Sequence, residues 1–437
     1  MYKKLSAPIG IQWELTSWCN HHCIYCYNYW RANTSILPDF LKSKEQNIIA
    51  NEIINNKIFD ICLTGGEPLF VIDKYYDCLL KLKNANIKMT LNSNLSSITN
   101  EHVNILKDIG INSILVSFPS DIKEVHDVIT GVKNSYDKVV SGIKYAINNN
   151  FNISISMVVT KINLNTIKST ANFIKDLGCN TFCVTRASYP SWNRNFLDYN
   201  LSHIDVLKML DDTIWTHDNL NLEIDTLTPC PICGFTSDKQ REHFHYRGCG
   251  AGCSSAIIGS SGQLRPCPQS EYNYGSVLDV GLKAAWDLMD DYRNDVFVPK
   301  YCKEECDAFP YDCQGGCRTY SKNMYGSLDS EDPMCTRKIL TKKPSAKKTN
   351  LILDDNYIIG DNEYRKEEFG YIVFSSRKNW VPIDDELFNI LSNNSVINKQ
   401  MIENELSVKS DEANYILYRL INNNIVLPIS NKKGGSL

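Results

Sequence analysis

The chain has 437 residues, of which 43% are hydrophobic and 10% aromatic, so it is long enough for two or three packed domains. Its net charge of −4 provides no broad basic field for nucleic acid. Because the N-terminus lacks the apolar core of a signal peptide and no stretch reaches membrane-spanning length, we expect a cytoplasmic protein that binds neither membrane nor nucleic acid.

Cysteine is unusually abundant, with 17 residues in a chain expected to lie in a reducing compartment where structural disulfides are uncommon. Three cysteines cluster near position 20 and ten lie between positions 230 and 335. Such clustering at short spacing is typical of metal binding, because several thiolates must converge on one centre. The isolated Cys62, Cys78, Cys179 and Cys183 have apolar neighbours and are expected in the core.

The first 190 residues alternate between apolar strands and amphipathic helices. The predicted strands lie at 9–17, 60–66, 87–94, 113–118, 152–160 and 181–187. This alternation favours a parallel sheet with right-handed crossovers, and six units are too few for an eight-fold barrel. We therefore predict an α/β fold with a partial (β/α)6 barrel over 1–190, whose working residues lie at the carboxyl ends of the strands.

The remaining chain divides by composition. Residues 191–245 are predicted to connect two domains, with a helix at 201–216, and the Cys- and Gly-rich residues 246–340 to depend on metal for their fold. Six of the twelve residues at 337–348 are basic, which indicates a solvated linker, placed at 341–350.

The last part, 351–437, is predicted to form a small domain of strands and short helices. The predicted strands lie at 369–376 and 425–428, and the predicted helices at 384–392, 398–407 and 410–423. Ser410 is the expected cap of the last helix.

Three cysteines follow the first predicted strand in the segment CNHHCIYC, at Cys19, Cys23 and Cys26. Three thiolates can hold three irons of a [4Fe–4S] cube and leave the fourth iron open for a small molecule. A zinc site is the alternative, with His21 or His22 as fourth ligand. The C-x3-C-x-aromatic-C spacing, together with LTGGEP after the second strand, resembles the radical SAM superfamily.

That resemblance implies how the cofactor would be bound. The open iron would chelate the methionine part of S-adenosylmethionine, and one electron from an external flavodoxin- or ferredoxin-type donor would release a 5'-deoxyadenosyl radical that abstracts hydrogen from the substrate. The Gly65-Gly66-Glu67 element would receive the amino group, and Tyr25 would flank the adenine. Asn92, Ser117 and Arg186, at three further strand ends, would complete the site, with Ser117 on ribose or carboxylate and Arg186 on the carboxylate. No catalytic acid or base is singled out.

A second set of eight cysteines starts at Cys249. It runs as Cys249-x3-Cys253-x13-Cys267, then Cys302-x3-Cys306-x6-Cys313-x3-Cys317, then Cys335. Eight thiolates suffice for two fully ligated [4Fe–4S] clusters. The Gly262-x4-Cys267 element and the later run resemble the SPASM domain of radical SAM maturases, with one extra residue in each of the first two gaps of the common C-x2-C-x5-C-x3-C spacing.

By this resemblance, Cys249, Cys253, Cys267 and Cys317 would hold an inner auxiliary cluster. Cys302, Cys306, Cys313 and Cys335 would hold an outer one, so that the chain carries three [4Fe–4S] clusters in all. Cys230 and Cys233 are expected to line a loop without metal. A zinc-ribbon site formed by these two with Cys249 and Cys253 is the alternative.

The C-terminal pattern resembles a winged-helix domain of the PqqD-like type, which in peptide maturases binds a leader peptide at a sheet edge. A simple helical cap is the alternative, and a DNA-reading winged helix is disfavoured because helix 410–423 is not basic. Together the resemblances imply a radical SAM enzyme that modifies a ribosomally made precursor peptide through a thioether or C–C crosslink. The rival hypotheses are a formylglycine-generating sulfatase maturase and a non-catalytic zinc or iron–sulfur scaffold for nucleic acid.

Overall fold

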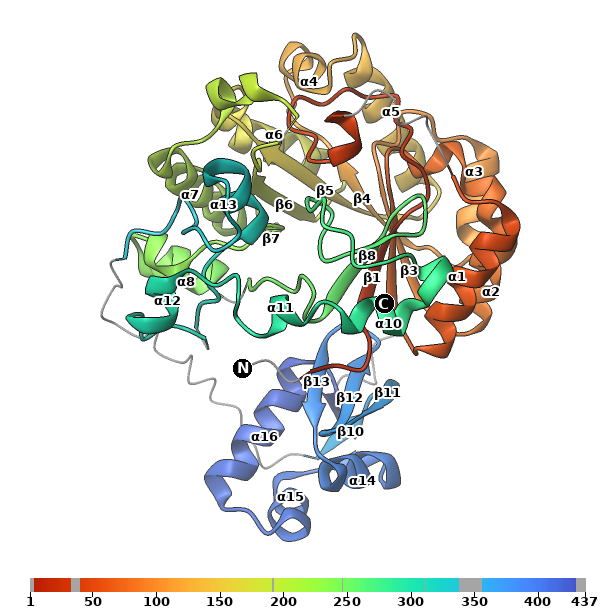
Figure 1. Cartoon of the computed structure of the whole chain (residues 1–437), viewed down its shortest axis with the longest axis vertical. Helices are drawn as coiled ribbons and strands as arrows, with labels where there is room; N and C mark the ends of the chain where they lie inside the picture. Colours follow the sequence, from red (N-terminus) through yellow and green to blue (C-terminus); the bar gives the residue numbers. More distant parts are fainter. Residues whose placement is uncertain are drawn as a thin grey trace. The chain divides into compact units, whose positions relative to one another are not determined.

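The computed structural model describes residues 4–32, 40–190, 192–245, 247–310, 312–337 and 356–429. It divides into two compact units, residues 1–344 and 345–437, and each is described by itself (Figure 1). The predicted linker at 341–350 lies outside the described residues. Among the helices of the described ranges, none has the length and apolar character needed to cross a bilayer.

An open, largely parallel sheet forms the centre of the larger unit (Figure 1). The six predicted strands are confirmed as β1 Gly10–Glu14, β2 Asp60–Thr64, β3 Lys88–Ser93, β4 Ser113–Ser117, β5 Asn152–Val159 and β6 Thr181–Arg186. Each pairs in parallel with the next, as in the predicted partial barrel.

Three strands that the sequence pattern did not predict extend this sheet to nine. β7 (Glu223–Asp225) pairs in parallel with β6, and β8 (Ser255–Ile258) pairs in parallel with β1. β9 (Leu264–Arg265) returns antiparallel to β8, which gives the order β7-β6-β5-β4-β3-β2-β1-β8-β9. The cysteine-rich segment therefore begins inside the barrel sheet.

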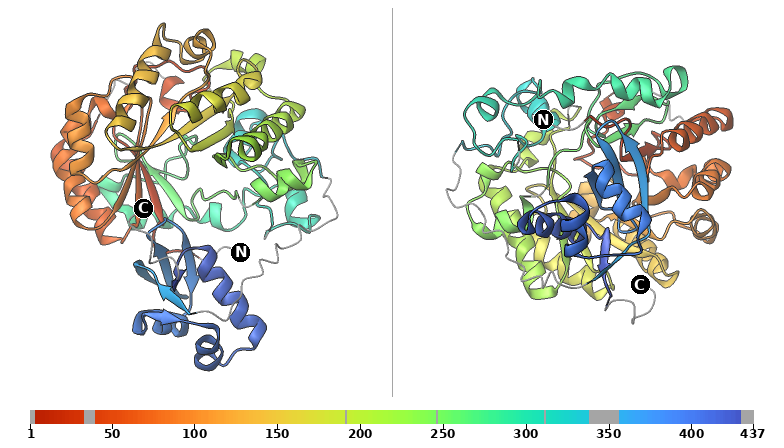
Figure 2. Two further views of the ribbon diagram at one scale, coloured as in Figure 1. Left: turned by 180° about the vertical axis from the view of Figure 1, so that it is seen from behind. Right: turned by 90° about the horizontal axis from the view of Figure 1, so that it is seen from below.

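Helices lie around the outside of the curved sheet (Figures 1 and 2). They are α1 Ser43–Asn55, α2 Tyr76–Asn84, α3 Asn100–Asp108, α4 Lys123–Thr130, α5 Ser135–Asn148, α6 Ile167–Asp176 and α7 His203–Leu220. Single 3-10 turns add η1 Tyr29–Ala32, η2 Pro68–Phe70, η3 Ile72–Tyr75, η4 Leu164–Thr166 and η5 Arg194–Tyr199.

Burial alternates along β2, β3 and β4, so that each of these strands has one packed face and one more open face. In β3, Met89 and Leu91 are buried while Thr90 and Asn92 are only half-buried. Because side chains alternate across a strand, the apolar residues pack together and the polar ones point to the other face of the sheet. That polar face carries the candidate site described below.

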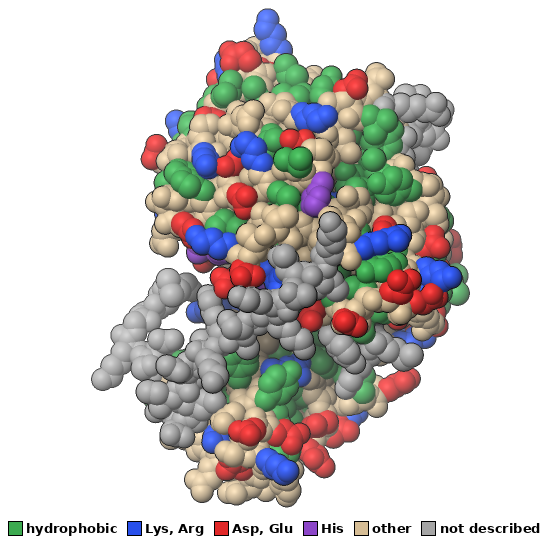
Figure 3. Space-filling model, turned by 90° about the vertical axis from the view of Figure 1, so that its left-hand side faces the viewer, with side chains coloured by type: hydrophobic (Ala, Val, Ile, Leu, Met, Phe, Trp, Pro, Cys, Tyr) green, Lys and Arg blue, Asp and Glu red, His purple; other side chains and the backbone are tan. Residues whose placement is uncertain are grey.

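Short elements make up the rest of the larger unit. They are η6 Ile232–Gly234, α8 Asp238–Phe244, α9 Val277–Val280, α10 Leu282–Asp287, α11 Asp290–Arg293, α12 Lys300–Glu304 and α13 Arg318–Tyr325. On the face shown in Figure 3, basic side chains are interspersed with acidic ones rather than gathered into one area.

The smaller unit contains two three-stranded sheets and three helices. β10 Tyr357–Ile359 lies between β14 Val396–Ile397 and β15 Val426–Pro428, and β12 Gly370–Ser375 lies between β11 Asn362–Glu367 and β13 Trp380–Ile383. The helices are α14 Asp385–Asn393, α15 Lys399–Leu406 and α16 Ser410–Asn422, close to the predicted ranges. A shared apolar core includes Val373, Ile390 and Leu417.

The expected cap of α16 was wrong. Ser410 is the first helical residue, and the N-cap is Lys409, whose side chain makes no capping hydrogen bond.

Candidate active site

A cavity of about 420 Å³ opens at the carboxyl ends of the parallel strands. The three cysteines of the first loop line it together with all seven residues predicted to contact S-adenosylmethionine. This set comprises Cys19, Cys23, Cys26, Tyr25, Gly65, Gly66, Glu67, Asn92, Ser117 and Arg186. Residues far apart in sequence thus converge on one cavity.

The cysteine loop is held by the turn that follows β2. Gly66 N donates to Thr16 O and Glu67 N to Trp18 O, both at 2.7 Å. A Cβ on Gly66 would lie 1.9 Å from Trp18 O, and one on Gly65 would lie 2.4 Å from Thr16 O. Gly65 also has a φ of +136°, which disfavours any other residue. The two glycines are therefore required for main chain to pack on main chain.

The three thiols are half-buried in the wall of the cavity. Burial, followed by the charge of Glu67, raises the pKa of Cys19 to about 12, and burial likewise raises the pKa of Cys23. A bound metal cation has the opposite effect: it lowers the pKa of a coordinating thiol, so that the thiol loses its proton. Three convergent thiols beside a cavity fit an iron–sulfur cluster with one open position.

Arg31 orders the two histidines between these cysteines. Its Nη2 donates to His21 O at 2.7 Å, and its Nη1 lies 3.2 Å from His22 Nδ1. Burial, followed by the charge of His22, lowers the pKa of His21 to about 4, so its ring is neutral at physiological pH. Only His21 of the two lines the cavity.

Glu67 has partners that the sequence did not reveal. Its carboxylate accepts hydrogen bonds from Ser93 Oγ at 2.6 Å, Asn94 N at 2.8 Å and Leu69 N at 3.3 Å. Burial raises the pKa of Glu67 to about 7, although these donors oppose the shift. Glu67 therefore ties the end of β2 to the end of β3, and its expected contact with the cofactor amino group stays a prediction.

Arg186 lines the cavity but already has a carboxylate partner. Its guanidinium binds Asp332 with two parallel hydrogen bonds of 2.8 and 2.5 Å, and it donates a third to Pro229 O at 3.1 Å. Both side chains are almost completely buried. The predicted contact between Arg186 and the cofactor carboxylate therefore competes with an ion pair inside the protein.

The remaining predicted contacts lie on the walls of the cavity. Asn92 is on the half-buried face of β3, Ser117 is exposed at the end of β4, and Tyr25 is buried. The Tyr25 ring packs with Ile129 and Phe196. All three residues line the cavity, and their contacts with the cofactor stay predictions.

Sequence reasoning missed further wall residues. Gln12, Cys62, Ser156, Arg247 and Gln269 all line the cavity, and Cys62 is half-buried there instead of in the core. The alternation along β1 and β2 places Gln12 and Cys62 on the same open face as Asn92 on β3. The two-residue alternation along these strands can be recognised in the sequence. No sequence pattern indicates that Arg247 and Gln269 lie in the wall of the same cavity.

The four cysteines of the predicted inner set interact with one another electrostatically through Cys249. Burial raises the pKa of Cys253, Cys267 and Cys317, and in each case the charge of Cys249 contributes to the shift. The four thiols predicted for the inner cluster are thus close enough to interact.

A second group contains the predicted outer set and also Cys233. Burial, and then the charges of Cys233 and Cys306, raises the pKa of Cys313. Cys335 interacts electrostatically with Cys302, and its Sγ accepts a hydrogen bond from Cys233 Sγ at 3.4 Å. Cys233 thus lies beside Cys335, whereas the zinc alternative grouped it with Cys249 and Cys253.

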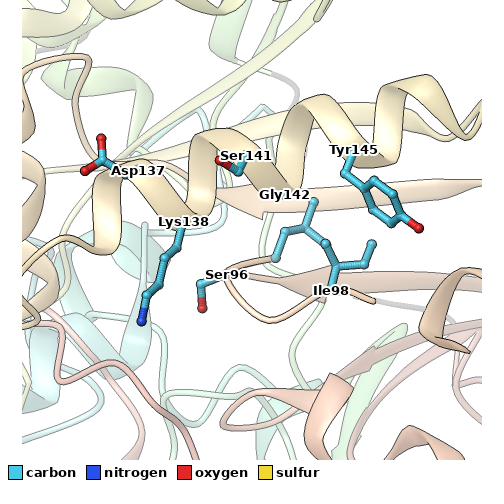
Figure 4. Close-up of a pocket in the computed structure, with 8 residues that line it drawn as sticks. Ser96, Ile98, Asp137, Lys138, Ser141, Gly142 and Tyr145 are labelled. Atoms are coloured by element: carbon cyan, nitrogen blue, oxygen red, sulfur yellow. The ribbon is translucent and has the colours of Figure 1, made fainter. Parts of the chain in front are cut away.

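A separate cavity of about 460 Å³ lies between the loop after β3 and helix α5 (Figure 4). Ser96, Ile98, Lys138, Ser141 and Tyr145 line it. None of the predicted site residues is among its lining residues, so we place the chemistry in the cavity at the strand ends.

Comparison with known proteins finds similarity along most of the chain. The model of the radical SAM superfamily matches residues 13–174. The AdoMet-dependent heme synthase of Oleidesulfovibrio alaskensis is 24% identical, over 77% of this chain and 89% of that protein. The mycofactocin maturase MftC of Mycolicibacterium smegmatis is also 24% identical, over 76% of this chain and 84% of that protein.

A solved structure shows the same fold. Streptococcus suis SuiB bound to precursor peptide SuiA has a TM-score of 0.61 at 19% identity, over 76% of this chain and 77% of that chain. Residues 13–174 are therefore a radical SAM domain. Enzymes of this family bind S-adenosylmethionine and a [4Fe–4S] cluster.

Proposed function

We propose that this enzyme modifies a ribosomally made precursor peptide, by forming a crosslink such as a thioether or C–C bond. The observation that carries the proposal is the combination of the strand-end cavity, its three-cysteine loop and two further groups of interacting cysteines in one compact unit. The similarity to MftC and to peptide-bound SuiB supports a peptide as the substrate class.

Each cysteine group has a proposed cluster. Cys19, Cys23 and Cys26 would hold the cluster that binds S-adenosylmethionine, and the other two groups would hold two auxiliary [4Fe–4S] clusters. When bound, S-adenosylmethionine supplies a carbon radical that removes hydrogen from an unactivated position. We propose an external flavodoxin- or ferredoxin-type protein as electron donor and no nucleic-acid partner.

The protein itself would position the reactants and exclude water. Gly65 and Gly66 bring main-chain groups to the cavity wall, where the amino group of the cofactor would lie. Asn92 and Ser117 would provide polar groups at the ends of β3 and β4, and buried Tyr25 would provide an aromatic surface for the adenine. Glu67 would act mainly by holding Ser93 and Asn94 in place.

The central test replaces Cys19, Cys23 and Cys26 together with Ala. We expect about four of roughly twelve irons to be lost, because no thiolate remains to hold the cube, and formation of 5'-deoxyadenosine to stop. A matched control replaces Cys78, Cys179 and Cys183, which are buried outside the cysteine groups. If the first triple variant still produced 5'-deoxyadenosine at the rate of the control, the assignment would be refuted.

A second candidate function is synthesis of heme, favoured by the similarity to the heme synthase. The two functions differ in substrate, so the anaerobic enzyme should be given a precursor peptide and a heme-precursor porphyrin in parallel. Mass spectrometry then identifies the product. A modified porphyrin with unchanged peptide would replace the proposed function by this second one.

A further inference from the structure

The outer cysteine group contains more thiols than a four-iron cube has corners for thiolates. Cys302, Cys306, Cys313 and Cys335 are the four predicted ligands. Cys233 is a further thiol, and its Sγ lies 3.4 Å from Cys335 Sγ. Cys233 and Cys302 are buried, with 8% and 6% of their surface exposed. Two sulfurs 3.4 Å apart are too close to bind separate irons of one cube as they stand, because the cube would have to fit between them. Cys335 also has a side-chain interaction with Cys302, so its sulfur must separate from one of these two neighbours when a cluster binds.

The segment that carries Cys233 is fixed against the segment that carries Cys335. Thr336 Oγ1 donates a hydrogen bond to Cys233 O. A Cβ on the neighbouring Gly234 would lie 2.5 Å from Met334 O, so only glycine allows this approach. Gly234 O also lies 2.8 Å from His203 Nε2 on α7, which anchors the turn η6 from its other side. The sulfur contact is therefore set by main-chain packing.

We propose that Cys233 and Cys335 share one corner of the outer auxiliary cluster, one thiolate binding the iron while the other thiol donates a hydrogen bond to it. This inference rests on the outer cluster of the proposed function. Cys335 is the ligand that the SPASM resemblance predicts, and the Cys233 thiol lies within hydrogen-bonding distance of it at 3.4 Å. If Cys335 is lost, the sulfur of Cys233 is the one next to the vacant corner.

A thiol in this place would affect the redox behaviour of the cluster. Hydrogen bonds to ligating sulfurs are one of the factors that set the reduction potential of an iron–sulfur cluster. Cys233 would thus act as a positioning and tuning residue for the cluster and as a reserve ligand. Cys230, three residues earlier, interacts electrostatically with Cys313, but the hydrogen bond of its Sγ is to Thr228 O at 3.9 Å and not to another sulfur.

The test compares single and double variants, purified and reconstituted anaerobically. We expect Cys233→Ala and Cys335→Ala each to keep about twelve irons per chain, with a changed EPR spectrum of the reduced protein, because one thiolate still holds the corner. The double variant should fall to about eight irons. Cys230→Ala is the matched control and should keep both the irons and the spectrum.

Two outcomes would overturn the inference. One is loss of about four irons by Cys335→Ala alone, and the other is a Cys233→Ala spectrum identical to that of Cys230→Ala. The single variants decide the question even if the double variant does not fold, and Cys335→Ser can replace an insoluble Cys335→Ala. A Cys302→Ala/Cys306→Ala variant tests the cluster itself, because full iron content there would refute the outer cluster and not merely the shared corner.

Discussion

At the scale of single residues, the cavity depends on two glycines and a buried carboxylate. Gly65 and Gly66 allow the turn after β2 to contact the backbone of the cysteine loop, and Glu67 then continues the same turn to β3. The cluster loop, the turn and two strand ends are thereby fixed to one another. A substitution at either glycine should therefore displace the cysteine loop and alter the whole cofactor site.

Replacing Gly66 with Ala should weaken binding of S-adenosylmethionine by at least tenfold. The added Cβ would lie 1.9 Å from Trp18 O, so the cysteine loop must move. Gly10→Ala is the matched control, since its Cβ would meet Asp60 O at an ordinary 3.5 Å. Anaerobic equilibrium binding with labelled S-adenosylmethionine measures the effect, and equal affinity of the two variants would contradict the proposed role of the turn.

The sequence was sufficient to predict residues that line the cavity, but not which other residues these contact. The spacing of Cys19, Cys23 and Cys26 and the strand-end rule were sufficient to gather the predicted set around one cavity. The Arg186–Asp332 pair was out of reach, because it joins positions 146 residues apart with no local pattern to connect them. The contact between Cys233 and Cys335 was out of reach for the same reason, since the two residues are 102 positions apart.

At the scale of elements, the Arg186–Asp332 pair links the end of β6 to the cysteine-rich segment. Asp332 Oδ2 also accepts a hydrogen bond from Cys317 N, and its Oδ1 accepts one from Met334 N, both at 2.9 Å. Cys317 and Cys335 are the predicted ligands nearest to it in sequence, one for each auxiliary cluster. A single buried carboxylate thus orders both predicted cluster segments against the barrel.

Replacing Asp332 with Asn should therefore destabilise the larger unit and lower its iron content. Removing the charge leaves the buried Arg186 without its counter-ion, which typically costs about 3–5 kcal/mol. The exposed Asp329 lies three residues away, so Asp329→Asn makes the same chemical change at a solvated position. Thermal unfolding and iron analysis measure both variants, and matching melting temperatures and iron contents would show that the pair does not hold the segments together.

The elements also show where periodicity fails as a predictor. The six strands of the barrel carry clear apolar repeats, but β7, β8 and β9 contain only three, four and two residues. Segments this short have too few residues for a repeat to be recognised. They form because a neighbouring strand edge supplies hydrogen bonds, as β1 does for β8. The sequence pattern therefore gave no sign that two strands of the cysteine-rich segment, β8 and β9, extend the barrel sheet.

At the scale of the whole molecule, the chain joins a catalytic unit to a small unit with its own core. In the smaller unit, β11 and β13 form the edges of one sheet, and Pro382 lies in β13. Proline has no N–H to donate, so β13 is the poorer edge for an added strand. β11 has six residues and is the edge where we expect a leader peptide to pair.

Ending the chain after Pro344, at the boundary between the units, tests whether the smaller unit binds the leader peptide while the larger unit carries the chemistry. The shortened enzyme should keep its iron and its uncoupled cleavage of S-adenosylmethionine, because every proposed cluster ligand precedes the cut. Its affinity for the precursor should fall at least tenfold, since main-chain pairing along a strand edge is lost. The measurement is an anaerobic titration of fluorescently labelled precursor against full-length and shortened enzyme. Equal affinity would mean that the smaller unit is only a cap and that the larger unit recognises the peptide by itself.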